Sequence, residues 1–240
     1  MTDTGFSPER PHQTSKDSIM SLQAVSLSEQ IARHLGEQII TGELAPGSRL
    51  PENELAKQLD VSTNSLREAF RLLEKQHMIE LQPRRGARVC EVTDEQVRDL
   101  YEFLFILLSR LAGQAAARWQ PGEIEDLVEM LPQLEQHFRN DDLRSAHQLA
   151  FQFVEIATVR FAHNRYLATD IQDLIPLLKR YSFIALQEDT SEFDVSLQIF
   201  KRLLVNVVGR NVADAEADIR EYGDNQCQIV LRAIAKRRAA

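Results

Sequence analysis

The stretch that decides the fold is VSTNSLREAFRLLEKQHMIELQPRRGARV, residues 61–89. Its first half places apolar residues at helical spacing, at Leu66, Ala69, Phe70 and Leu73. This spacing predicts a helix over about 63–77 with one buried face, and Ser62 is a favoured residue for capping its start. In the second half, Ile79, Leu81 and Val89 flank the turn Pro-Arg-Arg-Gly, which predicts two short strands with a basic tip.

Two more helices are expected before this stretch. Residues 26–44 carry apolar residues at steps of four, and Gly42 is a natural end for the helix. Residues 51–60, PENELAKQLD, form a second amphipathic segment that leads into the tight turn at Asp60 and Val61. Two helices joined by a short turn and followed by a hairpin are typical of a winged helix-turn-helix.

Composition sets limits on the class of protein. The chain has 240 residues, 43% of them hydrophobic, a net charge of −8 and a pI of about 5.3. An acidic chain is not expected to coat nucleic acid nonspecifically, although a small DNA-reading domain within it remains possible. Cys90 and Cys227 have no metal-ligand spacing, which fits a reducing cytoplasm. Residues 1–22 are polar and predict a disordered leader without the apolar core of a signal peptide, and we expect no membrane span.

The rest of the chain predicts long amphipathic helices. Five or six are expected, at roughly 94–118, 121–139, 142–162, 164–187, 191–209 and 212–237. We therefore predict a mainly α protein: a leader (1–22), a winged helix-turn-helix (23–92) and an all-helical bundle (93–240). The sequence lacks a nucleophile elbow, a P-loop, a G-x-G-x-x-G and an H-E-x-x-H motif, so we do not expect an enzyme.

The first 90 residues resemble the GntR family of bacterial regulators. The family pattern runs from I-x-x-G through P-G-x-x-L and L-A-x-x-L-x-V-S to an R-x-A helix and a glycine-containing wing. The matching residues here are Ile40, Gly42, Pro46, Gly47, Leu50, Leu55, Ala56, Leu59, Val61, Ser62, Arg67, Ala69 and Gly86. The helical half is similar to the FadR-type branch, whose ligand-binding domain is a helical bundle; the FCD domain is of this kind.

The resemblance implies a set of DNA-facing residues. They are the start of the third helix and the wing: Ser62, Thr63, Asn64, Ser65, Arg67, Arg84, Arg85 and Gly86. Asn64 can pair with an adenine edge, and Arg67 can reach guanine or phosphate. Family members commonly carry arginine where Thr63 and Asn53 stand here, so we expect an altered operator sequence or weaker binding.

Many relatives of this branch hold a divalent metal in the bundle. At the positions of their metal ligands, this sequence has residues that do not coordinate metals well. The equivalent positions fall on Ala150, Val154, Phe200 and Tyr222, and two further cavity positions fall on Leu104 and Leu108. A shifted register would place Gln148 and Gln152 at the first two. His137, His147 and His163 are interpreted as surface residues. We therefore expect no metal and no cofactor.

An apolar interior leaves two alternatives. The bundle is either a filled core without an effector, or a cavity for a lipophilic effector such as a fatty acyl chain. A small anionic effector is not expected, because burying an anion without partners is costly. The first bundle helix also carries Phe103, Phe105 and Leu107, which lie outside the apolar stripe expected to face the core. Because the helix is apolar nearly all round, it is expected to pack on both sides.

These features together predict a cytoplasmic DNA-binding regulator, by family default a repressor. It is expected to act as a homodimer on a palindromic operator in double-stranded DNA. If the bundle binds an effector, we expect that effector to alter the spacing of the two recognition helices. The alternative is a helical scaffold whose winged helix contacts another protein.

Overall fold

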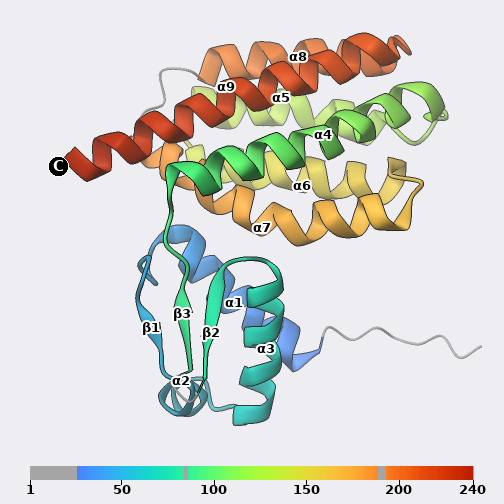
Figure 1. The fold of residues 1–240 in the computed structure, drawn as a ribbon. Helices are drawn as coiled ribbons and strands as arrows, with labels where there is room; N and C mark the ends of the chain where they lie inside the picture. Colours follow the sequence, from blue (N-terminus) through green and yellow to red (C-terminus); the bar gives the residue numbers. More distant parts are fainter. Residues whose placement is uncertain (1–25, 84–85, 189–192, 240) are drawn as a thin grey trace, which may run out of the picture.

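The computed structural model describes residues 26–83, 86–188 and 193–239. The predicted leader at 1–22 and the wing residues Arg84 and Arg85 lie outside these ranges. A small unit of helices and strands comes first, and a bundle of long helices lies across one end of it (Figure 1). This arrangement confirms the predicted fold class, a mainly α protein with an N-terminal winged helix-turn-helix.

The first unit contains three helices and a small sheet. Its elements are α1 (Leu27–Thr41), β1 (Arg49–Leu50), α2 (Glu52–Gln58), α3 (Thr63–Lys75), β2 (Ile79–Gln82) and β3 (Gly86–Val89). The strands are antiparallel in the order β1-β3-β2. The sequence did not indicate β1, because two residues are too few to show the alternation by which a strand is recognised.

Local chemistry explains where α1 begins and ends. Ser26 and Glu29 form a capping box: the Ser26 hydroxyl accepts from the backbone N–H of Glu29, whose carboxylate accepts from that of Ser26. Gly42 ends the helix in the left-handed conformation at φ 84°. In α3, the predicted apolar stripe is at most 1% exposed at Leu66, Ala69, Phe70 and Leu73.

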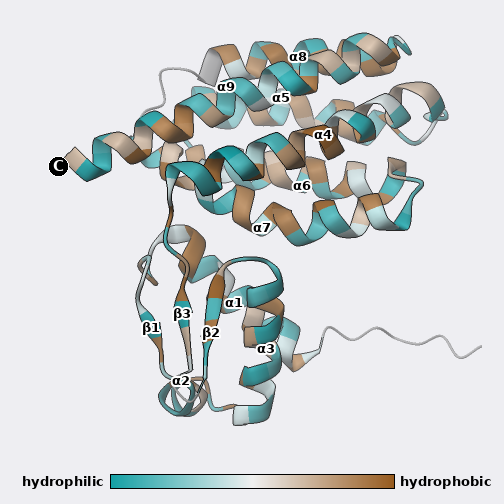
Figure 2. Cartoon of the chain, in the orientation of Figure 1, coloured by the Kyte–Doolittle hydropathy of each residue, from teal (hydrophilic) through white to brown (hydrophobic). Residues whose placement is uncertain are grey.

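Six helices form the bundle. They are α4 (Asp94–Arg118), α5 (Glu125–Arg139), α6 (Leu143–Phe161), α7 (Arg165–Glu188), α8 (Phe193–Val208) and α9 (Val212–Ala239). Most carry both hydrophilic and hydrophobic residues along their length, as amphipathic helices that share a core should (Figure 2). The main departure from the expected bounds is the start of α5, which begins at Glu125 because Gly122 at φ 92° makes a turn first.

Helix α4 is the central helix of the bundle, packed against α9 along much of its length. By length and composition alone α4 is apolar enough to cross a membrane, but 67% of its most apolar stretch is buried within the protein. Phe105, expected to look outward, is only 6% exposed because its ring lies against α9 at Gly223. The exposed apolar residues of α4 are instead Phe103 and Ile106, at 51% and 59%.

Gly223 provides a test of this packing. A Cβ built at Gly223 would lie 2.3 Å from the Phe105 ring, so Gly223→Ala requires α4 and α9 to move apart. We expect it to lower the free energy of unfolding by about 1–3 kcal/mol, measured by urea denaturation. Gly36→Ala is the matched control, since its Cβ would be 3.5 Å from Leu73 in ordinary contact. That change should be neutral or stabilise by up to about 1 kcal/mol, and equal effects of the two substitutions would contradict the packing described here.

Candidate functional site

The start of α3 combines a capping function with exposed polar side chains. The Ser62 hydroxyl accepts from the backbone N–H of Ser65 at 3.0 Å and lies 2.9 Å from the Ser65 hydroxyl. Both hydroxyls are therefore used within the helix start, and Thr63 is half-buried. Asn64 is exposed. Of these four residues, Asn64 has the side chain best placed to contact a base edge.

Arg67 lies one turn further along α3 and is also exposed. Its Nη2 is 2.8 Å from the Glu52 carboxylate at the start of α2, and its side chain is 56% exposed. An exposed ion pair of this kind contributes little stability. A phosphate or a guanine edge can therefore compete with Glu52 for the Arg67 guanidinium, at the cost of leaving that carboxylate without its partner.

Gly86 is required by the sheet itself. It adopts φ 84°, and a Cβ there would lie 2.4 Å from the backbone carbonyl oxygen of Leu50 in β1. The sequence placed Gly86 in the turn of the hairpin and among the DNA-facing residues; the contact with β1 is an additional constraint that the sequence did not show. The adjacent tip residues, Arg84 and Arg85, lie outside the described residues.

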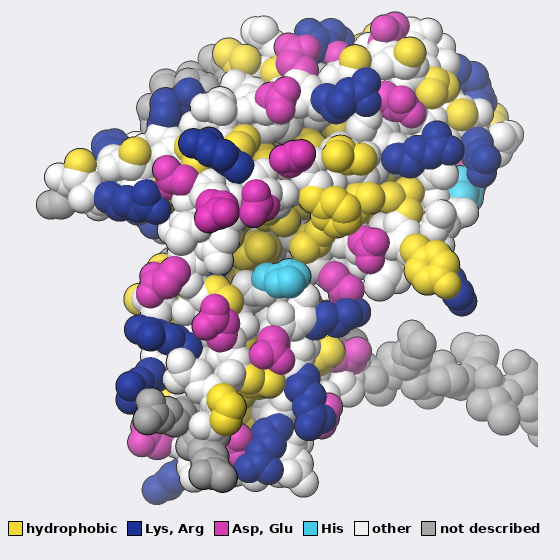
Figure 3. All heavy atoms as spheres, in the orientation of Figure 1, with side chains coloured by type: hydrophobic (Ala, Val, Ile, Leu, Met, Phe, Trp, Pro, Cys, Tyr) yellow, Lys and Arg dark blue, Asp and Glu magenta, His cyan; other side chains and the backbone are white. Residues whose placement is uncertain are grey.

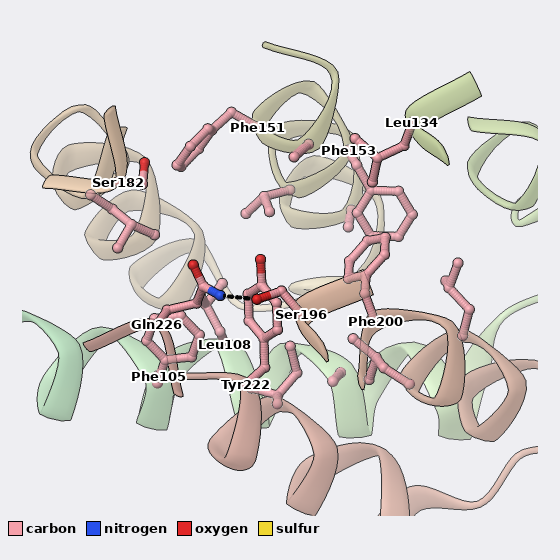
Figure 4. A pocket seen from close by; sticks show the side chains of 18 of the residues that line it. Phe105, Leu108, Leu134, Phe151, Phe153, Ser182, Ser196, Phe200, Tyr222 and Gln226 are labelled. Carbon is pink, nitrogen blue, oxygen red and sulfur yellow. Dashed lines mark hydrogen bonds between the residues drawn. The ribbon is translucent and has the colours of Figure 1, made fainter. Parts of the chain in front are cut away.

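A cavity of about 190 Å³ lies inside the bundle, bounded by α4 to α9 (Figure 4). The expected candidates Leu108, Ala150, Val154, Phe200 and Tyr222 all line it. The bundle interior is therefore not completely filled, contrary to the filled-core alternative.

Leu104 is a correction, because it does not line the cavity. The face of α4 turned toward the cavity runs through Tyr101, Phe105, Leu108 and Ala112, and Leu104 lies off this face, fully buried elsewhere in the core. The sequence allows two alignments for the first two metal-ligand positions. The residues of the first alignment, Ala150 and Val154, face the cavity, whereas Gln148 and Gln152 of the shifted alignment are exposed.

The residues at the family's metal-ligand positions do not fit a metal. Ala150, Val154 and Phe200 carry no ligand atom, and a Tyr222 phenol alone makes a poor site for zinc or a similar ion. In the described part of the chain, no three His, Cys, Asp or Glu side chains lie close enough together to hold a metal ion.

His147 is a second correction, because the prediction that it is a surface residue is wrong. It lines the cavity, and its Nε2 is 2.8 Å from the hydroxyl of Ser182 on α7. The Ser182 hydroxyl donates to the Lys179 carbonyl, so the histidine must be the donor in this pair, through Nε2–H. Burial, with a smaller contribution from the charge of Lys179, lowers the pKa of His147 to about 4, so it is neutral at pH 7.

Helix α7 connects the cavity to the first unit. Leu178, Ser182 and Ala185 line the cavity from α7. Arg180 on the same helix is 2% exposed, and its Nη2 donates to the carbonyl of Cys90, just after β3, at 2.7 Å. Its Nη1 has no hydrogen-bond partner among the described residues. The same helix contacts α1, and Asp173 pairs with Lys75 at the end of α3 at 2.7 Å.

A winged helix-turn-helix is a DNA-binding motif, and here it is followed by a helical domain with an internal cavity. Residues 27–89 match the family described as bacterial regulatory proteins, gntR family, and residues 99–225 match the FCD domain. The chain belongs to the FCD branch of the GntR family of bacterial transcriptional regulators. Members of this family bind DNA, and FCD domains bind small-molecule effectors.

Named relatives agree with this family assignment, and a solved structure shares the fold. The HTH-type transcriptional regulator YdhC of Bacillus subtilis is 26% identical over 204 residues, which cover 83% of this chain and 88% of that protein. The gluconate operon transcriptional repressor of Bacillus licheniformis is 24% identical and covers 77% of this chain and 74% of its own length. The structure of McbR/YncC from Escherichia coli has the same fold, with a TM-score of 0.75 and 22% identity over 87% of this chain and 98% of that one.

The low pKa of His147, a half-buried residue of the cavity wall, predicts a pH dependence of stability. The pKa of His147 is about 4 in the folded state against an ordinary value of 6.5. Between these values the unfolded chain binds more protons, so stability falls as the pH falls from about 6.5 to 4. The full contribution is on the order of 3 kcal/mol. In urea denaturation at several pH values, His147→Gln should lack this component, and the exposed-site control His34→Gln should keep it. Identical pH profiles for the two variants would show that His147 is not buried as a neutral group.

Proposed function

We propose that the protein is a cytoplasmic transcriptional repressor that binds a palindromic operator as a homodimer and responds to a lipophilic effector in its bundle cavity. The observation that carries the DNA-binding part is the start of α3. Its apolar face is buried in the first unit, while Asn64 and Arg67 on the outer side remain exposed. Two relatives are named as repressors, of the gluconate and galactonate operons, which supports the repressor assignment.

The contacts proposed for α3 follow from its side chains. Asn64 has the donor and acceptor pair needed for the adenine edge in the major groove, and Arg67 has the reach for guanine or phosphate. Thr63 is half-buried and short, so it contributes at most a hydroxyl contact. Because few cationic side chains face the DNA from each copy, two copies on one palindrome are needed for useful affinity.

The outer face of α4 is the surface we assign to the homodimer. Phe103 and Ile106 are three residues apart, both more than half exposed, and Leu107 lies beside them half-buried. Figure 3 shows hydrophobic side chains gathered along α4 and between it and α7 on this face. A self-complementary apolar patch on a straight helix suits a two-fold interface, which is the commonest symmetry of homo-oligomers.

Helix α7 connects the cavity with the DNA-binding unit, because it lines the one and contacts the other. A ligand that fills the cavity presses on Leu178 and Ser182, and the same helix holds the segment after the wing through Arg180. We infer that occupancy alters how the two units are held together and so the spacing of the two α3 helices. Operator affinity measured with and without ligand decides this, and unchanged affinity at saturating ligand contradicts it.

The DNA-binding proposal is tested by selecting genomic fragments with the full-length protein at physiological salt. We expect a palindromic motif. In fluorescence anisotropy with that motif, Asn64→Ala should lower discrimination at one base pair per half-site by about 1–3 kcal/mol. Arg67→Ala should weaken binding and, where it contacts phosphate, also reduce the salt dependence.

Arg139→Ala is the control for charge, because Arg139 lies on α5 with its side chain 76% exposed and paired with Glu135. It should leave DNA binding unchanged. Binding without sequence preference, or equal losses for Arg67→Ala and Arg139→Ala, would overturn the proposal. The protein-binding scaffold would then be the better description.

The dimer is tested by placing charge on α4. Phe103→Asp combined with Ile106→Asp should convert the protein to a monomer, because burying two carboxylates in an apolar interface is costly. Sedimentation equilibrium measures the state directly. Val159→Asp on α6 is the matched control, at a site 75% exposed, and should leave a dimer. A wild-type monomer, or a dimer unaffected by the α4 changes, would remove α4 as the interface.

A further inference from the structure

The size of the cavity limits what it can hold. Its volume is about 190 Å³, and an engineered protein cavity of about 150 Å³ is enough to bind benzene. Typical pockets for drug-sized molecules start at about 300 Å³. The space therefore suits one aromatic ring with a small substituent, and the long fatty acyl chain considered from the sequence exceeds it.

The charge of the lining limits the ligand further. No Lys, Arg, Asp or Glu is among the described residues that line the cavity, and His147 is neutral at pH 7. Lys179 lies close to His147, but its Nζ is paired with the Glu155 carboxylate at 2.7 Å. A carboxylate ligand would thus lose its hydration without gaining a counter-charge, which is strongly unfavourable.

The cavity nevertheless has one polar edge. Tyr222 and Gln226 stand four residues apart on α9, so they share a helical face. The Nε2 of Gln226 donates to the Ser196 hydroxyl on α8 at 2.5 Å, which leaves its carbonyl oxygen free to accept. Figure 4 shows this oxygen and the Tyr222 hydroxyl pointing toward the same space. Neither oxygen has a hydrogen-bond partner among the residues that the structure describes.

Aromatic rings make up much of the remaining wall. Phe153 and Phe200 meet edge to face with centroids 4.9 Å apart, and Phe200 lies 6.3 Å from the Tyr222 ring. Edge-to-face and offset contacts of this kind stabilise an aromatic guest beyond simple burial. The polar edge and the aromatic wall therefore lie next to each other at Tyr222.

We propose that the cavity binds a small uncharged aromatic compound that carries one hydroxyl group, with the ring against Phe153 and Phe200. The ligand hydroxyl donates to the Gln226 carbonyl oxygen and accepts from the Tyr222 hydroxyl. This inference rests on the proposed function, since it names the chemical class of the effector that the bundle cavity takes.

The test compares three probes of similar size on the full-length protein by titration calorimetry at pH 7. Benzyl alcohol has the ring and the hydroxyl, toluene lacks the hydroxyl, and benzoate carries a charge. We expect benzyl alcohol to bind about tenfold or more tightly than either of the others, because toluene leaves the Tyr222 hydroxyl and the Gln226 carbonyl without a partner and benzoate is desolvated without a counter-charge. Benzoate binding as tightly as benzyl alcohol, or equal binding of toluene, would overturn the proposal.

Substitutions test whether the probes bind at the polar edge formed by Tyr222 and Gln226. Tyr222→Phe combined with Gln226→Leu should weaken benzyl alcohol about tenfold and leave toluene unchanged or tighter. Gln148→Leu, an exposed glutamine on α6, is the matched control and should change neither. Ala112→Leu fills the cavity and should abolish binding of all three probes, with circular dichroism and DNA binding showing that the variant is folded. A double variant that keeps the preference for benzyl alcohol would place the site elsewhere.

DNA binding by the same preparation separates this inference from the proposed function. Specific operator binding without binding of any probe would overturn the ligand class and leave the regulator intact. Probe binding with the expected preference, but no specific DNA binding, would support the cavity chemistry and overturn the regulator.

Discussion

At Gly223 the helices α4 and α9 come so close that the Phe105 ring occupies the space where a Cβ would lie. This contact determines more than the packing of two helices. Phe105 also lines the cavity, and Tyr222, the residue before Gly223, presents its hydroxyl to the same space. The close approach thus sets the distance between two walls of the cavity, while Phe103 and Ile106 on α4 stay exposed.

Charged side chains are kept away from the cavity, even where they are buried. Asp218 on α9 is 5% exposed, but it accepts from Arg202 at 2.5 Å and Asn206 at 2.7 Å on α8. Arg220 likewise bonds the Ser109 hydroxyl at 2.7 Å. The buried groups Asp218 and Ser109 thus have partners on α8 and α9, and no charged side chain is among the described residues that line the cavity. The lining of the cavity is therefore uncharged, which is consistent with the absence of metal ligands at the family's ligand positions.

Helix α7 carries two functions on different faces. One face lines the cavity, and the other supports the first unit through Arg180, Asp173 and the contact with α1. The Nη1 of Arg180 has no hydrogen-bond partner among the described residues, and this makes the junction costly, since a buried donor without a partner destabilises the arrangement that holds it. In the function proposed above, a shift of α7 would be passed to the first unit through this junction.

Much of the fold could be read from the sequence because it depends on local periodicity and caps. The helix positions, the buried stripe of α3 and the family membership all follow from residues that are neighbours along the chain. Leu104 and Leu108, one turn apart on α4, show the limit: both are apolar, yet only Leu108 lines the cavity. The burial of His147, the outward side of α4 and the two-residue strand β1 likewise could not be assigned from the sequence. Each depends on which helix or strand packs against it, and that is decided by contacts between segments far apart in the chain. The sequence by itself therefore determined the elements and the class of protein, whereas only the tertiary structure decided that a neutral cavity exists and which side chains reach it.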